Sequence, residues 1–265
     1  MAEPLLIDRS DGVLTITLNR PRVKNAVTLA GWAALRDAFR SVDPLSDRVV
    51  VVTGADGDFC AGADLDARGT RDRTGAHQVD DMRVVGDACL ALHRLPVPTI
   101  ARVDGVAVGA GMNLALACDF VVASTRARFS EIFVRRAMSV DFGGSWVLPR
   151  LVGLHRAKEL VLLGDIIDAG TAREIGLLHR VTDVTELDAA VVALAARLAA
   201  GPRLAMAGSK ALLNNSFDRT LEQALDDEGR TQAISTSSPD VDEAVEAFRQ
   251  KRPPVYGGDR PQEGS

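Results

Sequence analysis

Two glycine-rich segments constrain this chain more than any other feature of its sequence. The first is Gly54–Leu65 (GADGDFCAGADL) and the second is Val103–Asp119 (VDGVAVGAGMNLALACD). Each follows a β-branched run that predicts a buried strand, Val49–Thr53 and Pro98–Val103, and each leads into a predicted helix start. Glycine lets a ligand approach the backbone closely, and free N–H groups at a helix start favour negative charge. Two such N–H groups that converge on one carbonyl oxygen would make an oxyanion hole.

The rest of the pattern places strands early and helices late. Leu5–Asp8 and Val13–Leu18 predict two strands around the turn at Ser10–Gly12, and Thr28 predicts the N-cap of a helix that runs to about Val42. The polar segment 65–78 predicts a loop. We therefore expect an α/β core over residues 1–200 and a helical C-terminal region over 201–265. Further short strands are predicted at 120–123 and 128–130, and helices at 79–95, 143–152, 156–163, 169–175, 187–200, 202–214, 219–235 and 241–250.

Composition excludes several classes of protein. The 265 residues are 46% hydrophobic and 25% charged, which is an ordinary globular balance, and the net charge of −5 gives no reason to expect a nucleic-acid partner. We find no transmembrane run and no signal peptide, so we expect a cytoplasmic protein without a membrane partner. The three cysteines show no metal-ligand spacing with the four histidines. They are interpreted as structural thiols, with Cys60 as a nucleophile the alternative.

Three further motifs complete a family pattern: Thr17–Val27 (TLNRPRVKNAV), Phe142–Gly153 (FGGSWVLPRLVG) and Ala247–Pro254 (AFRQKRPP). With both glycine-rich segments, in this order, the chain resembles the crotonase family, the enoyl-CoA hydratase/isomerase superfamily. The resemblance implies an α/β spiral of strand–strand–helix units with a helical C-terminal trimerisation region. It also implies a homotrimer or a dimer of trimers. The implied substrates are acyl-CoA thioesters, with no metal or separate cofactor, because coenzyme A is part of the substrate.

The family stabilises a thioester enolate with two backbone N–H groups. By position, the resemblance assigns these donors to Ala63, after Gly62, and to Ala110, after Gly109. The family often has glycine at the second donor position, but a backbone N–H does not depend on the side chain. Asp64, in the same AGAD motif, is expected to cap the helix that follows.

The acid–base residues depart from those of typical hydratases, which use two glutamates. Asn113 stands at the first position, and asparagine cannot exchange protons at neutral pH. A gapless alignment from Phe129 puts Phe133 at the second position, while a two-residue shift would restore an acid at Glu131. Asp141 occupies the place of an aspartate found in isomerase-like and dehalogenase-like branches. We expect Asp141 to carry the proton; the alternatives are a helix N-cap at Asp141 and catalysis by Glu131.

Basic residues in two of the motifs are expected to bind the coenzyme. By resemblance, Arg22 and Lys24, beside Arg20, lie near its nucleotide end, and Phe248 and Lys251 reach the nucleotide, often of a neighbouring subunit. The sequence therefore predicts an enzyme that acts on an acyl- or enoyl-CoA through an enolate, by hydration or by double-bond isomerisation. The alternative is a non-catalytic acyl-CoA-binding protein.

Overall fold

The computed structural model describes residues 3–65 and 78–257, and its larger sheet has six strands. Their order across the sheet is β1-β2-β3-β4-β6-β9. A two-residue turn at Asp11 and Gly12, both with positive φ, pairs the first two strands antiparallel, and the other neighbours are parallel. The strands are β1 (Leu5–Ser10), β2 (Val13–Leu18), β3 (Val49–Gly54), β4 (Thr99–Val103), β6 (Phe120–Ser124) and β9 (Arg180–Thr182).

A second, three-stranded sheet has the order β5-β7-β8. It is built from β5 (Val106–Val108), β7 (Arg128–Ser130) and β8 (Ile167–Asp168). The chain passes from β4 into β5 through Gly105, where φ is +56° and an added Cβ would lie 2.4 Å from Gly57 O. This corner moves the chain from one sheet to the other and brings it beside the first glycine-rich segment.

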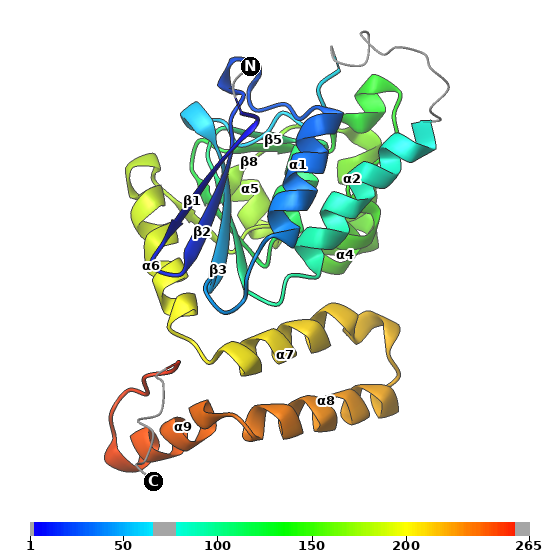
Figure 1. Cartoon of the computed structure of the whole chain (residues 1–265). Helices are drawn as coiled ribbons and strands as arrows, with labels where there is room; N and C mark the ends of the chain where they lie inside the picture. Colours follow the sequence, from blue (N-terminus) through cyan, green and yellow to red (C-terminus); the bar gives the residue numbers. More distant parts are fainter. Residues whose placement is uncertain (1–2, 66–77, 258–265) are drawn as a thin grey trace.

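The central strand β3 is buried on both faces, as its continuous apolar run predicts. Val50 and Val52 face the core formed with α1 (Leu29–Arg40) and α2 (Gln78–His93), while Val49 and Val51 pack against α6 (Leu187–Ala199). Figure 1 shows α1 and α2 side by side over the sheet. Thr28 caps α1 as predicted, by accepting a hydrogen bond from Gly31 N at 3.1 Å.

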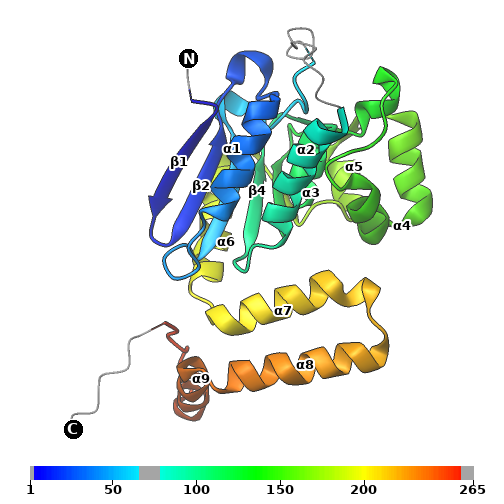
Figure 2. The ribbon, with the colours of Figure 1, turned by 45° about the vertical axis from the view of Figure 1, so that its right-hand side comes forward.

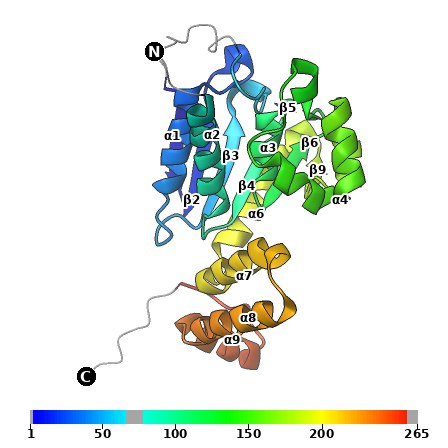
Figure 3. The same cartoon turned by 90° about the vertical axis from the view of Figure 1, so that its right-hand side faces the viewer.

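The remaining helices alternate with the later strands and then form the C-terminal region. In chain order they are α3 (Ala110–Leu116), η4 (Ile132–Arg136), α4 (Gly144–Leu163, broken at Gly153), α5 (Ala169–Glu174), α7 (Arg203–Asn215), α8 (Leu221–Thr236) and α9 (Pro239–Gln250). The last three lie together below the sheets in all three views (Figures 1, 2 and 3). α7 and α8 have no fully buried residue, and Leu213, Phe217 and Leu221 are exposed.

The predicted α/β crotonase-like architecture is confirmed, with differences in detail. The short strands β5, β8 and β9 were not predicted. The side chain of Asp168 caps α5, and that of Ser238 caps α9. Among the described residues, no single helix is long and apolar enough to cross a membrane. Only the pair Val184–Ala199 and Arg203–Asp218, bent by 106°, reaches that length and composition together. The cytoplasmic location stays a prediction.

Candidate active site

The first glycine-rich segment holds the peptide group between Gly62 and Ala63 by hydrogen bonds on either side. Val27 N donates to Gly62 O at 2.8 Å, and Asp64 N donates to Val27 O at 2.9 Å. Because a trans peptide points its C=O and N–H in opposite directions, the Ala63 N–H points away from Val27. No hydrogen bond between described residues uses this N–H. It is therefore available to a ligand.

The second segment orients the N–H of Ala110 in the same way. Gly109 N donates to Ser130 O at 2.8 Å, and Gly109 O accepts from Asn113 N at 3.1 Å in the first turn of α3. Gly109 has φ 54° and ψ −130°, a conformation that suits glycine. Ala110 is the first residue of α3, so its N–H points out of the helix start and is left without an intrahelical acceptor.

Close packing of the two segments brings these amides together. Cys60 N donates to Val106 O at 2.8 Å, and Val108 N donates to Cys60 O at 3.0 Å. An added Cβ at Gly62 would lie 2.8 Å from Val108 O and 3.5 Å from Ala110 N. The Gly62–Ala63 peptide therefore lies beside the start of α3. Two N–H groups at one place can bind a single carbonyl oxygen.

Cys60 is a structural thiol in this arrangement. Its side chain is fully buried, and Gly62 N donates to Sγ at 3.4 Å. Burial raises the pKa of the Cys60 thiol to about 12, so the thiolate that a nucleophile requires is suppressed. An added Cβ at Gly111 would lie 2.8 Å from this sulfur, which shows how closely α3 packs on the first segment.

Arg20 and Asn25 fix the first segment from the Thr17–Val27 side. Arg20 Nη1 lies 2.7 Å from Asp64 Oδ2 and donates to Ala26 O at 2.6 Å. Asn25 Nδ2 donates to Asp58 O at 2.7 Å. Arg20 was expected to meet the coenzyme, but it is bound to the residue after Ala63. The expected capping role of Asp64 concerns a segment that lies outside the described residues.

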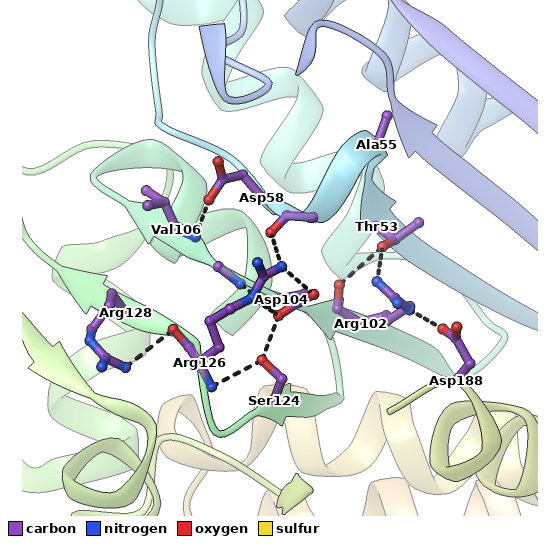
Figure 4. Close-up of polar contacts among 12 residues, drawn as sticks. Thr53, Ala55, Asp58, Arg102, Asp104, Val106, Ser124, Arg126, Arg128 and Asp188 are labelled. Carbon is purple, nitrogen blue, oxygen red and sulfur yellow. Dashed lines mark hydrogen bonds and ion pairs between the residues drawn. The ribbon is translucent and has the colours of Figure 1, made fainter. Parts of the chain in front are cut away.

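A second set of contacts fixes the turn where β4 leads into β5 (Figure 4). Asp104 accepts from Arg126 Nη2 at 2.6 Å and from Ser124 Oγ at 2.6 Å. Burial acts to raise the pKa of Asp104, but these hydrogen bonds outweigh it and hold the pKa below its ordinary value. Arg126 also donates to Gly57 O at 2.7 Å, so one side chain connects both glycine-rich segments.

Asn113 of α3 connects Glu131 with the turn that begins at Asp141. Asn113 Nδ2 donates to Glu131 Oε2 at 3.3 Å and to the main-chain oxygen of Asp141 at 3.0 Å. Glu131 is fully buried. Its pKa is raised to about 8, first by burial and then by the charge of Asp141, against the hydrogen bond from Asn113. Glu131 therefore contacts Asn113, and the expectation that Asp141 carries the proton instead of Glu131 stays a prediction.

Phe133 lies beside Gly109, the residue before Ala110. Its ring would be 3.6 Å from a Cβ added at Gly109, and the residue is only 5% exposed. An apolar ring therefore stands beside the start of α3, and the assignment of Phe133 to the position of a hydratase glutamate stays a prediction.

Asp141 does not cap the helix that follows it. The N-cap of α4 is Gly143, and no side chain caps this helix. Asp141 instead begins a turn closed by Gly144 N donating to Asp141 O at 3.0 Å. Phe142, in the turn, has φ 47° and packs its ring 4.9 Å from that of Trp32. The structure therefore removes the N-cap interpretation of Asp141.

The residues expected to bind the coenzyme are not brought together in one chain. Arg22 and Lys24 are exposed beside the first segment, and Lys24 Nζ lies 3.9 Å from Asp58 Oδ2. Phe248 is 85% exposed on α9, and Lys251 follows that helix. α9 lies at the opposite end of the molecule from β5 (Figure 1).

Fold and site together define a protein of the crotonase type, and the comparisons agree. The sequence profile described as enoyl-CoA hydratase/isomerase matches residues 8–259. The 1,2-epoxyphenylacetyl-CoA isomerase of Escherichia coli K12 is 37% identical, over 97% of this chain and 100% of the relative. An enoyl-CoA hydratase from Bacillus anthracis superposes with a TM-score of 0.90 at 32% identity, over 97% of this chain and 100% of that one.

A third relative, from Thermobifida fusca YX, is grouped with the enoyl-CoA hydratases and was solved in complex with CoA. It has a TM-score of 0.83 and 33% identity, over 88% of this chain and 93% of its own. The chain belongs to the enoyl-CoA hydratase/isomerase family and is an enzyme of that family. The family acts on CoA thioesters without a separate cofactor. No group of three or more possible metal ligands occurs in the described parts of the chain.

Proposed function

We propose that this enzyme isomerises an enoyl-CoA through a thioester enolate bound by the N–H groups of Ala63 and Ala110. The observation that carries this proposal is the position of Ala110 N, 3.5 Å from a Cβ built on Gly62, the residue before Ala63. The negative charge of an enolate lies on the thioester oxygen, so preorganised donors there stabilise the transition state more than the ground state.

Asp141 is the proposed proton carrier. For a 3-enoyl-CoA, its carboxylate takes a proton from C2, the carbon beside the thioester carbonyl, which leaves the enolate, and returns the proton to C4, the far carbon of the original double bond, so that the double bond moves to C2 and C3. One carboxylate is enough for that transfer, whereas hydration must also activate water. Asn113 and Phe133 stand where hydratases carry glutamates, which favours isomerisation. The Escherichia coli relative named above is likewise an isomerase.

An enoyl-CoA assay tests this proposal. The purified protein is incubated with a short 3-enoyl-CoA and, separately, with its 2-enoyl isomer, and products are followed by mass and absorbance. Double-bond migration without a gain of water is expected. Asp141→Asn should lower turnover by roughly 100- to 10,000-fold and leave acyl-CoA binding intact, because it removes a general base and preserves shape. Water addition by the wild type would indicate a hydratase, and binding without turnover would indicate the non-catalytic alternative.

We also propose that the chain assembles into trimers. The support is the exposed apolar surface of the last three helices and of the turn η6 (Ser216–Asp218) between α7 and α8, which includes Leu213, Phe217 and Phe248. Assembly would let Phe248 and Lys251 reach a coenzyme held by the neighbouring subunit. A stable monomer in light scattering at micromolar concentration would contradict this.

A further inference from the structure

Glu131 and Asn113 each have a buried oxygen atom without a hydrogen-bond partner among the described residues. Both side chains are at most 1% exposed, and one hydrogen bond of 3.3 Å already joins Asn113 Nδ2 to Glu131 Oε2. Glu131 Oε1 and Asn113 Oδ1 are both buried and receive no hydrogen bond from any described residue. A buried carboxylate with one long hydrogen bond is costly, and so is a buried amide oxygen without a donor.

A single proton on Glu131 Oε1 would let both of these oxygen atoms take part in a hydrogen bond. A neutral carboxylic acid gains an O–H donor on Oε1, and the unmatched Asn113 Oδ1 is an acceptor on the side chain to which Glu131 is already joined. The acid and the amide then exchange two hydrogen bonds, one in each direction. The amide orientation required for this is the one that also lets Asn113 Nδ2 donate to Asp141 O at 3.0 Å.

The charges around Glu131 favour the same state. Among the described residues, Asp141 is the group whose charge acts on Glu131, and a second negative charge opposes ionisation. Cys89 of α2, on which the charge of Asp141 also acts, is a neutral thiol, because burial, followed by that charge, raises its pKa to about 11. The nearby Arg135 is paired with Asp165.

We propose that Glu131 is held as a neutral carboxylic acid that donates to Asn113 Oδ1 and so acts as a positioning residue for the turn that carries Asp141. The proton locks the orientation of the Asn113 amide, and the amide supports the turn through Asp141 O. Space around the amide is tight, since a Cβ added at Gly144 would lie 2.4 Å from Asn113 Nδ2. This role of Glu131 rests on the proposed function for its link to Asp141, while its protonation does not.

Infrared spectroscopy of the wild-type protein tests the protonation directly. The carbonyl band of a protonated carboxylic acid should be present at pH 7, shift in deuterated water, and be absent from Glu131→Gln. The matched control is Glu159→Gln, which removes a carboxylate that is 53% exposed and paired with Arg156, and which should leave the band unchanged. Absence of the band from the wild type at pH 7 would overturn the proposal, whether or not the protein turns over an enoyl-CoA.

Activity of the same variant tests the positioning role. Glutamine offers one N–H and one C=O to Asn113, as the neutral acid does, so Glu131→Gln should retain turnover to within about twofold at pH 7. Wild-type turnover should fall as pH rises through about 8, where Glu131 ionises, and this decline should be absent from the variant. A loss of roughly 100-fold or more in Glu131→Gln, with its fold intact, would make Glu131 a proton carrier instead. An unchanged alkaline decline would also refute the positioning role.

Discussion

The raised pKa of Glu131 predicts a specific dependence of stability on pH. The folded-state pKa is about 8, against an ordinary value of 4.5. Below pH 4.5 the carboxyl is protonated in both folded and unfolded chains, so its contribution to stability is fully present. Between the two values only the unfolded chain ionises, and the native state loses stability as pH rises. Above the folded-state pKa both states are ionised and the loss is complete.

The size of this loss of stability follows from the size of the pKa shift. One pKa unit corresponds to about 1.4 kcal/mol, so a shift from 4.5 to about 8 corresponds to a total loss of about 5 kcal/mol. At pH 7 the pH lies about 2.5 units above the ordinary pKa, so the loss of stability amounts to about 3 kcal/mol. Glu131→Gln keeps the hydrogen bonds of the neutral acid and does not titrate. At pH 7 the variant should therefore be more stable than the wild type by about 3 kcal/mol, or roughly 6 to 12 °C in Tm.

The measurement is urea unfolding of wild type and Glu131→Gln from pH 5 to 9, at one protein concentration because assembly would add to stability. The difference in unfolding free energy should grow by about 1.4 kcal/mol per pH unit up to pH 8 and then level. Glu159→Gln, the exposed control, should run parallel to the wild type. Parallel curves for Glu131→Gln would mean that Glu131 is ionised in the folded protein, and the argument from its burial would be refuted.

Two further substitutions test the oxyanion amides and the contacts that hold them. Ala110→Pro removes one donor at a helix position that tolerates proline, and should lower turnover by roughly 100- to 1000-fold. The control Ala110→Gly keeps the N–H and should stay active. Full activity in the folded proline variant would show that Ala110 is no donor. Asp104→Asn should lower the free energy of unfolding by about 1.5 to 3 kcal/mol, because it weakens the charge-assisted hydrogen bonds from Arg126. An unchanged midpoint in urea unfolding would contradict the supporting role assigned to Arg126.

Local physical chemistry made much of the fold predictable. The run Val49–Thr53 is apolar at every position but the last, and only a strand covered on both faces buries all of it. The β1–β2 turn needs positive φ at two residues, which Asp-Gly supplies. Thr28 offers a side-chain oxygen at the point where a helical pattern begins. In each case the signal lies within a few consecutive residues.

The features that were missed depend on partners distant in the sequence. Strand β5 has three residues and β8 has two, too few to show an alternating pattern, and each is defined by its neighbours across the sheet. Arg20 resembles a surface cation until Asp64 is brought 2.7 Å from it. The contact between Glu131 and Asn113 is of the same kind, because it joins the residue after β7 to α3.

The electrostatics of the proposed reaction connect these observations. An enolate is an anion, and a carboxylate about 4 Å away repels it by about 4 kcal/mol at an effective dielectric constant of about 20. A site with three ionised groups at positions 113, 131 and 141 would therefore oppose the enolate that we propose is bound by the amides of Ala63 and Ala110. Asn113 is neutral by its chemistry, and on the proposed assignment Glu131 is neutral by its burial. Asp141 then remains as the single negative charge, and it too is discharged when it takes the proton. The enolate forms at the moment when the carboxylate beside it becomes neutral, so the net charge of the pocket stays constant through the transfer. That is the arrangement in which one carboxyl group can move a proton from one carbon to another without the help of a second.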